Sequence, residues 1–578
     1  MRHSHPSRST PPGPPTRGDG ARHRRRTYLA TLLGVLALVD ASAAHAGSAP
    51  FEQVYASRAR LVSRVPASGN GQRVIGFDGA SSFVVGNTAY WSTGDLNIDG
   101  DGDGFYDKYT EPFGFRTGTI GRAPLRHPDK GVDLKLRQNA AGVVLPALQP
   151  NTANHECLFW PNELFEADSK LYFFFGIQYE APACGAPGAA KTTGIGLGRL
   201  TDPGSDDLGP VREGTAGDWQ YYLSPLRIGS VVYTFRIGAG TTLLAARVDE
   251  KHVASRDRYE YWTGPDTKWG GETNAVPLAQ LEFLDGTPKI AFSAHLGRFL
   301  MIYACNTFSA ICARTAKLPG ATAAALESGF NEKTVLMDHP AAFYVTWHWG
   351  YVDSRHPERI YLTTARQPEG RLYYATWWEL DLSAQPPAAT RTFYYGGRDL
   401  YRDGPGGGAW DYATYDPGSP GAGLSTGTMI AGFGPPHPNP DIPPLGGFVG
   451  NETVAGTSAP GAAPNAVWPS ETRGGAIVWT APAMGRIEIS STMWLESTRG
   501  DNALGEIFLV RGGTVLPLWS KKLVAKWHKT RQRHVHRTNV AVQPGDRLVL
   551  GVRKGKHSTS NALNDLTFID VSITLDRA

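Results

Sequence analysis

Carboxylates are concentrated in one short stretch of the sequence, WSTGDLNIDGDGDGFYDKY, which runs from Trp91 to Tyr109. Asp95 follows a strand-like run in this region, and Asp78 precedes the same run in IGFDGASS. If the run folds into a hairpin, the two carboxylates lie at the same end of it. Glycoside hydrolysis needs two convergent carboxylates, one as acid and one as nucleophile or base. We therefore take Asp78 and Asp95 as the candidate catalytic pair.

The rest of the acidic stretch has the spacing of a calcium loop, which places oxygen ligands at alternate positions and a glycine at the sharp turn. A frame that begins at Asp99 fits the first nine positions, but it has no glutamate at the twelfth. Carboxylates this close together repel one another unless a cation joins them. Whether Asp95 belongs to the chemistry or to this metal site is left open. We expect a structural Ca²⁺ ion whose ligands come from Asp99, Asp101, Asp103, Phe105 and Asp107.

The elements that must position these residues are short β-strands. A chain of 578 residues is too long for one ordinary core, so two or three domains are expected. The 68 glycines and 42 prolines, with only 19% charged residues, favour many turns over long solvated helices. A net charge of +4 over this length argues against nucleic acid as a partner. The composition therefore predicts an all-β protein.

Strand runs alternate with Gly, Pro and Asp turns from Phe51 to Leu382. Runs such as KLYFFFGIQY and RFLMIYA are short and apolar or follow period two, and no helical stripe of comparable length competes with them. Several runs form pairs joined by short turns, as in the blades of a β-propeller. A propeller gathers its ligand site on the central axis, so functional residues should come from distant segments.

The first 46 residues have the pattern of an export signal. Basic residues up to Arg26 precede an apolar stretch from Tyr28 to Val39, and Ala44-His45-Ala46 supplies a small-x-small cleavage site. The apolar stretch is shorter than the roughly 20 residues that a membrane span needs. RRTYL resembles the twin-arginine signal, with the Sec route as the alternative. We expect residues 1–46 to be a signal peptide of a secreted protein with no membrane span.

The four cysteines of an exported chain predict two disulfides. Three pairings are possible, and the shortest loops are closed by Cys157 with Cys184 and by Cys305 with Cys312. We expect that pairing, in a role of loop stapling. No poised partner identifies a catalytic thiol among them.

The sequence changes character after the strand runs. Residues 386–465 are rich in glycine and proline, as in DGPGGGAW, and predict a linker or extended wrap. Residues 466–578 return to strand pairs with a turn at Pro544-Gly545-Asp546, which predicts a smaller antiparallel β-sandwich. The basic run from Lys521 to Arg537 is expected to be a solvated strand face, with binding of an acidic glycan or a metal as alternatives.

The order of several motifs resembles a known family. FDGASSFVVGNTAYWSTGD, WPNELFEADSKLYFFF, YWTGPDTKWG and LGRFLMIYA resemble segments of a bacterial glycoside hydrolase family, formerly a domain of unknown function, that includes endo-D-arabinanases. The resemblance covers roughly residues 51–382 and implies a five-bladed β-propeller that hydrolyses arabinan-like glycans. Near the C-terminus, WTAPAMG and the later Pro-Gly-Asp turn resemble the jelly-roll modules of exported carbohydrate-active enzymes.

The sequence departs from that family at two positions. Leu96 stands where the family has a threonine after Gly-Asp, and Lys289 stands where a glutamate is expected shortly before a strand. A His-Pro pair at His356 lies where the family has one near its last blade. The polar residues at strand ends that we take as candidates for substrate contact are His155, Glu163, Asp266, Glu272, His339 and His356.

Together these patterns predict an all-β protein, with a five-bladed β-propeller over residues 51–385 followed by a jelly-roll-like antiparallel β-sandwich that could bind carbohydrate. The leading hypothesis is a secreted, monomeric hydrolase of furanose-containing polysaccharide such as cell-wall arabinan. The alternative is a non-catalytic, calcium-stabilised carbohydrate-binding or cell-surface protein with the same fold. The two differ in whether Asp78 and Asp95 share an accessible cleft or Asp95 turns away toward a cation.

Overall fold

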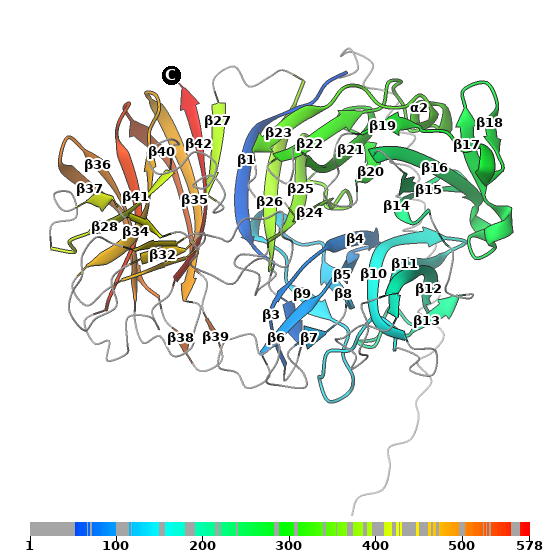
Figure 1. Cartoon of the computed structure of the whole chain (residues 1–578), viewed down its shortest axis with the longest axis horizontal. Helices are drawn as coiled ribbons and strands as arrows, with labels where there is room; N and C mark the ends of the chain where they lie inside the picture. The colour runs from blue at the N-terminus through cyan, green and yellow to red at the C-terminus, as the bar shows by residue number, and fades with distance from the viewer. Residues whose placement is uncertain are drawn as a thin grey trace, which may run out of the picture. The chain divides into compact units, whose positions relative to one another are not determined.

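The structure, a computed structural model, consists almost entirely of β-strands (Figure 1). Helices among the described residues are short: α2 (Ala323–Glu327) and the 3₁₀ helices η2 (Pro128–Lys130), η6 (Glu250–His252), η7 (Arg256–Arg258) and η8 (Glu272–Asn274). No helix in this part of the chain is long and apolar enough to cross a membrane. The structure describes residues 52–577 apart from gaps of one to three residues and the longer gaps 100–114, 150–155, 180–190, 214–218, 282–287, 306–309, 339–342, 367–373, 385–389, 396–409, 419–423, 431–446, 450–460, 496–502 and 556–566.

Five β-sheets make up the first part of the chain. Their strands are β4 (Ala80–Val85), β5 (Thr88–Thr93), β8 (Ile120–Pro124) and β9 (Leu134–Leu136) in blade 1; β10 (Glu156–Ala167), β11 (Lys170–Tyr179), β12 (Lys191–Leu200) and β13 (Pro210–Glu213) in blade 2; β14 (Leu223–Ile228), β15 (Val231–Ile237), β16 (Thr242–Asp249), β17 (Glu260–Gly264), β18 (Lys268–Gly270) and β19 (Ala279–Gln280) in blade 3; β20 (Lys289–Ser293), β21 (Arg298–Cys305), β22 (Ala310–Thr315) and β23 (Thr334–Asp338) in blade 4; and β24 (Phe343–Trp347), β25 (Arg359–Arg366), β26 (Tyr374–Ser383) and β1 (Tyr55–Arg64) in blade 5. Blade 1 is extended by β2 (Ala67–Gly69), β3 (Gln72–Phe77), β6 (Leu96–Asp99) and β7 (Phe115–Arg116).

The five sheets close into a ring. The inner strand β4 contacts β10, β10 contacts β14, and β14 contacts β20. The ring is completed by contacts from β21 to β24 and from β24 back to β4. This arrangement confirms the predicted five-bladed β-propeller. Strands such as β21 and β22 are buried along their whole length, because each lies between neighbouring blades, and this explains their continuous apolar sequence.

The last blade takes its outer strand from the beginning of the propeller sequence. Strand β1 pairs antiparallel with β26, in a register that runs from Tyr55 opposite Ser383 to Arg64 opposite Thr376. Figure 1 shows β1, in blue, beside the green β26. The two ends of the propeller sequence are therefore joined by backbone hydrogen bonds.

The rest of the described chain forms two packed sheets, which confirms the predicted antiparallel sandwich. One sheet contains β30 (Thr428–Ile430), β31 (Gly447–Val449), β32 (Gly461–Ala463), β33 (Ala466–Trp468), β42 (Thr567–Arg577), β35 (Gly485–Leu495), β40 (Arg533–Val542) and β27 (Thr390–Tyr395). The other contains β29 (Ser425–Thr426), β28 (Trp410–Tyr415), β34 (Gly474–Thr480), β41 (Arg547–Arg553), β36 (Leu504–Arg511) and β37 (Thr514–Lys522); a separate hairpin joins β38 (Ala525–Lys526) and β39 (Lys529–Thr530).

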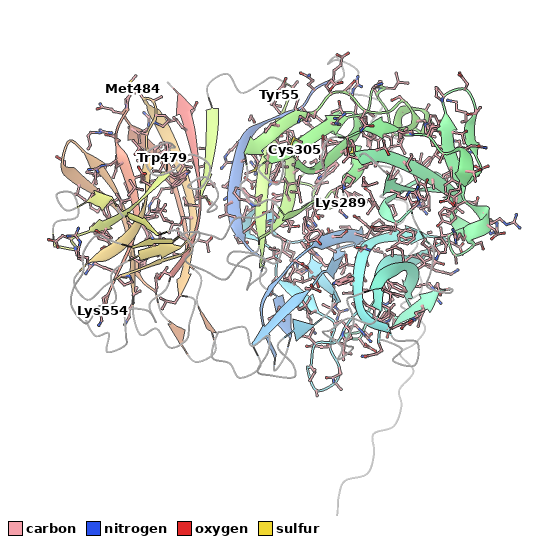
Figure 2. All side chains as sticks on the ribbon, in the orientation of Figure 1. Tyr55, Lys289, Cys305, Trp479, Met484 and Lys554 are labelled. Carbon is pink, nitrogen blue, oxygen red and sulfur yellow. A yellow bond between two sulfur atoms is a disulfide. The ribbon has the colours of Figure 1, made fainter. Side chains whose placement is uncertain are left out.

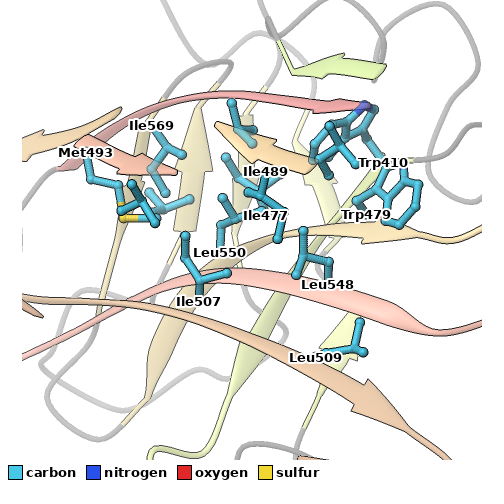
Figure 3. Packing of buried hydrophobic residues seen from close by; sticks show 14 of the residues in the cluster. Trp410, Ile477, Trp479, Ile489, Met493, Ile507, Leu509, Leu548, Leu550 and Ile569 are labelled. Carbon is cyan, nitrogen blue, oxygen red and sulfur yellow. The ribbon is translucent and has the colours of Figure 1, made fainter. Parts of the chain in front are cut away.

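Side chains from both sheets of the sandwich meet in one apolar core (Figure 3). Ile489 comes from β35, whereas Ile477 and Leu550 come from the facing sheet. Trp410 also lies in this core, although it comes from the range 386–465 that we expected to be a linker or extended wrap. That range supplies β27, which pairs with β42, and β28, which pairs with β34. The sandwich therefore includes strands that precede residue 466.

Strand β1 also contacts the sandwich through hydrogen bonds. The backbone N–H of Leu61 donates to Ser572 Oγ at 3.1 Å, and the Leu61 carbonyl accepts from Ser490 Oγ. Thr574 Oγ1 donates to the Ala59 carbonyl at 3.2 Å. These bonds pair backbone groups of β1 that its neighbour β26 does not use.

The disulfide between Cys305 and Cys312 is present and joins β21 to β22 in blade 4, as predicted. The two cysteines are seven positions apart in the sequence and lie on adjacent strands, which fits a stapling role. The side chains of Cys157 and Cys184 lie outside the described residues, so their pairing stays a prediction. Residues 1–51, with the expected signal peptide, also lie outside them.

Candidate active site

The β4–β5 hairpin brings the two predicted carboxylates together. Ala80 pairs with Thr93 at the end of the hairpin, so Asp78 and Asp95 lie just beyond the two paired strands. The backbone N–H of Asp78 donates to the Asp95 carbonyl at 3.1 Å, and the N–H of Gly94 donates to the Asp78 carbonyl at 2.8 Å. The hairpin thus places both aspartates at one end, as the sequence predicted.

Both aspartates line a cavity of about 340 Å³. Residues from blades 1, 2, 4 and 5 contribute to it, so segments more than two hundred residues apart meet there. Lys289 is labelled in Figure 2, where it lies among the inner strands of the propeller. The lining residues are Asp78, Gly79, Ala80, Ser81, Ser92, Gly94, Asp95, Trp160, Pro161, Asn162, Glu163, Lys289, Tyr344 and Thr346.

The surroundings of Asp78 favour the protonated form of its carboxyl. Burial raises the pKa of its carboxyl well above the usual range, and the neighbouring Asp95 carboxylate raises it further. Oδ1 of Asp78 accepts a hydrogen bond from the backbone N–H of Asp95 at 2.6 Å, which opposes this shift without cancelling it. With one oxygen occupied by that donor, the second oxygen is the one that can carry the proton.

Asp95 has a different environment. The indole N–H of Trp160 donates to Asp95 Oδ1 at 2.6 Å, and Asp95 is only partly buried. A hydrogen bond from a neutral donor favours the ionised form of a carboxylate that accepts it. The two aspartates that face this cavity therefore have different environments, one largely buried and one hydrogen-bonded by an indole N–H, and unlike environments suit acid–base chemistry.

A buried ion pair forms another wall of the cavity. The Lys289 ammonium contacts Glu163 Oε1 and donates to Ser81 Oγ at 2.8 Å, and Ser81 Oγ donates to Glu163 Oε2 at 3.2 Å. Burial lowers the pKa of Lys289, and the Glu163 carboxylate opposes that shift. The three residues join the inner strands of blades 1, 2 and 4. Glu163, predicted as a substrate contact, does line the cavity, with its charge matched by the lysine.

His348 lies beside this wall and was not predicted from the sequence. Its ring nitrogens lie 2.7 Å from Ser82 Oγ and 2.8 Å from Thr363 Oγ1, and its ring stacks on Trp91 at 4.4 Å between centroids. Complete burial lowers its pKa well below the usual range, and Lys289 lowers it further. His348 is therefore neutral, and its hydrogen bond with Ser82 holds strand β4 in place. Its place in the apolar run FYVTWHWG, after alternating buried residues, is the signal that could have revealed it.

Irregular pairing at the inner strands aims side chains into the cavity. The pairing of β10 with β11 shifts between Pro161 and Leu164, and the pairing of β24 with β25 shifts between Phe343 and Thr346. Such bulges add a residue to one strand and re-aim the side chains around it. Glu163 and Tyr344 occupy the two irregular segments and both line the cavity.

The other predicted contact residues do not line this cavity. Asp266 lies in the exposed turn between β17 and β18, and Glu272 lies in η8, 3.8 Å from Arg236. His356 is half exposed, and its Nδ1 lies 3.2 Å from Glu358. The remaining two, His155 and His339, lie outside the described residues.

Most of the predicted calcium loop also lies outside the described residues. Asp99 ends strand β6, but its side chain is not described, and residues 100–114 contain the other four expected ligands. In the part of the chain that is described, no three His, Cys, Asp or Glu residues gather closely enough to hold a metal ion. The calcium site stays a prediction. Within the structure, Asp95 contacts Trp160 and lines the cavity.

We expect the substitution Gly94→Ala to destabilise the hairpin end. A Cβ at this position would lie 1.9 Å from Asp78 Oδ1, so the buried carboxyl would have to move. Overpacking of this kind costs about 1–3 kcal/mol of unfolding free energy. Urea unfolding checks it, with Gly271→Ala as control, because that glycine has φ −70° and no atom within 4 Å of the added methyl. Equal stability of the two variants would contradict the packing described here.

Comparisons with known proteins add a likeness of fold. No family model and no curated protein matches the sequence. Solved structures that resemble it include an α-L-arabinofuranosidase from Podospora anserina in complex with cellotriose, at 10% identity over 58% of this chain and 99% of that one, with a TM-score of 0.33. A GH43 enzyme from Xanthomonas citri complexed with xylotriose is 14% identical, with a TM-score of 0.32. The match covers 59% of this chain and 92% of that one. The sialidase of Trypanosoma rangeli in complex with the inhibitor DANA is 9% identical, with a TM-score of 0.30. The match covers 88% of this chain and 82% of that one. With TM-scores this low, no activity is inferred from these matches. The fold is established by the ring of sheets, and the chemistry is argued from the residues that line the cavity.

Proposed function

We propose that this protein is a glycoside hydrolase that cleaves furanose-containing, arabinan-like polysaccharide with Asp78 and Asp95. The observation that carries the proposal is the pair itself: two aspartates face one cavity, one with its pKa raised by burial and the other hydrogen-bonded by an indole N–H. An acid and a base or nucleophile are the two groups that glycosidic cleavage requires. The sugar class comes from the four sequence motifs that resemble the endo-D-arabinanase family.

The environments of the two aspartates support different proposed roles. Asp78, whose pKa is raised by burial, acts as the acid that donates its proton to the departing glycosidic oxygen as the C–O bond breaks. In this proposal Asp95 acts as the carboxylate that either attacks the anomeric carbon or takes a proton from the water that does. Glu163 is paired with Lys289, so we assign it to binding and to shaping the cavity.

Activity on a panel of polysaccharides tests this function. The purified full chain is incubated with arabinans, arabinogalactan and, as unrelated substrates, cellulose and xylan, and the released oligosaccharides are separated by chromatography. Release from the furanose polymers alone is the expected result. Binding of these polymers without any release would favour the alternative, a carbohydrate-binding surface protein. Release from xylan or cellulose alone would contradict the proposed substrate class.

We also propose that Ca²⁺ bound by the loop from Asp99 to Asp107 stabilises the fold. Its carboxylates repel one another without a cation, and a ligand that binds only the folded state raises stability by mass action. Chelation should therefore lower the melting temperature, and added Ca²⁺ should restore it. Identical melting curves with excess chelator and with excess Ca²⁺ would rule the site out. Export by the signal at residues 1–46 and carbohydrate binding by the sandwich complete the proposal for the whole chain.

A further inference from the structure

Tyr344 has a backbone conformation that tyrosine rarely adopts. Its φ angle is +47°, in the left-handed region, where Cβ is crowded against the backbone. A bulky residue at positive φ is an outlier that persists only when the surrounding structure imposes it. Such strain is concentrated at functional sites, so its position in the fold is informative.

The strained residue lies at the cavity. Tyr344 is the second residue of β24, within the irregular segment of that inner strand, and it lines the cavity with Asp78 and Asp95. A Cβ on Gly79 would lie 3.7 Å from Cγ of Tyr344, so the ring packs beside the backbone that carries Asp78. Tyr344 nevertheless stays 36% exposed, which makes it one of the more exposed large side chains in the described propeller.

The chemistry of the remaining wall indicates what the ring can hold. Asn162 supplies a polar group that suits a sugar hydroxyl, and Trp160 supplies the aromatic group beside Asp95. A tyrosine ring offers a flat apolar face with a polar tip, which suits a sugar ring that presents C–H groups on one side and hydroxyls at its edge. The ring therefore occupies the side of the cavity next to the proton donor.

We propose that Tyr344 is a substrate-binding residue that holds a furanose ring against the Asp78 side of the cavity, and that its left-handed backbone is retained because it places the ring there. This inference rests on the proposed glycosidase function. A purely structural role predicts that the strain serves a tight turn, and that loss of the ring leaves sugar binding unchanged.

Three substitutions separate these roles. Tyr344→Gly and Tyr344→Ala both remove the ring, but only glycine relieves the strain, so the glycine variant should melt at the higher temperature. Both should raise KM about tenfold, which corresponds to about 1.4 kcal/mol of lost binding, with kcat changed much less. Tyr344→Phe keeps the flat face and should retain nearly the original KM.

Lys268 provides the matched control. It also has a left-handed backbone, with φ of +60°, but it lies at the exposed start of β18 in blade 3 and does not line the cavity. Lys268→Gly should melt above Lys268→Ala in the same way, and neither should change KM. An unchanged KM in Tyr344→Gly, in a protein whose original form cleaves arabinan, would overturn the inference and leave the proposed function intact.

Binding measurements cover the case in which catalysis is absent. Calorimetric titration of the original chain and of Tyr344→Ala with an arabino-oligosaccharide gives the affinity without turnover. A tenfold loss of affinity in the variant, with no cleavage by either protein, would support the role of Tyr344 and refute the hydrolase. Equal affinity in both proteins would refute the role of Tyr344.

Discussion

Asp78→Asn and Asp95→Asn should each lower kcat on arabinan by at least ~10²-fold, the lower end of what acid–base catalysis contributes. Asparagine at position 78 has no proton of comparable acidity to donate, and asparagine at position 95 can neither attack nor accept a proton. Both variants should fold, because the amide is nearly isosteric and its oxygen can still accept the hydrogen bonds from Asp95 N–H and Trp160 Nε1–H. Initial rates of reducing-end release measure the effect. Near-normal rates from either folded variant would refute the assignment of that residue.

Asp78→Asn should also raise the free energy of unfolding, by an amount that depends on pH. The folded-state pKa of Asp78 lies above its ordinary value of 3.8. Below pH 3.8 the Asp78 carboxyl is protonated in both the folded and the unfolded state, and the raised pKa contributes its full stabilising effect. As the pH rises above 3.8, Asp78 ionises first in the unfolded chain. The folded state therefore loses stability relative to the unfolded state. Asp78→Asn removes this loss, so the variant should gain stability over the original protein at pH 7, and the gain should shrink toward pH 4.

Lys289→Met should have the largest effect on stability, a loss of ~3–5 kcal/mol in unfolding free energy at pH 7.5. The substitution leaves the Glu163 carboxylate buried without its cation and also removes the donor to Ser81. Protonation of the orphaned carboxyl reduces the penalty, so the loss should be smaller at pH 5 than at pH 7.5. Urea unfolding at the two pH values measures both quantities.

Two further variants make that result interpretable. Glu163→Gln combined with Lys289→Met removes both charges, and the double variant should recover most of the lost stability. Lys170→Met removes a lysine whose partner, Asp168, is about half exposed, and it should leave stability unchanged within error. If the double variant is no more stable than Lys289→Met alone, the ion pair is not the source of the effect.

Local sequence patterns predicted the parts of the structure that local interactions determine. The alternating run between Asp78 and Asp95 specifies a hairpin, and a hairpin places the residues before and after it at one end. The short spacing of Cys305 and Cys312 likewise fits two adjacent strands. A propeller was expected from paired strand runs and its five blades from the resemblance, and the closed ring of five sheets confirms both.

The remaining parts depend on contacts between distant segments. Glu163 and Lys289 lie in different blades, and no local pattern shows that ring closure brings them together. The lysine that replaced an expected glutamate turned out to pair with a glutamate from blade 2. Strands β27 and β28 were missed because their short aromatic runs lie within a sequence rich in glycine and proline, and they become strands by pairing with β42 and β34.

The pairing of β1 with β26 has a consequence for the order of folding. Residues 55–64 are synthesised before the rest of the propeller, but their partners at 376–383 emerge more than three hundred residues later. Until then β1 has an exposed edge, and blade 5 has no outer strand. Completing blade 5 therefore requires a contact of very long sequence separation, which is slow to form. Once formed, this pairing must break before blades 1 and 5 can separate. We expect the complete ring to unfold slowly, so that the persistence of the folded protein is governed by a rate of opening.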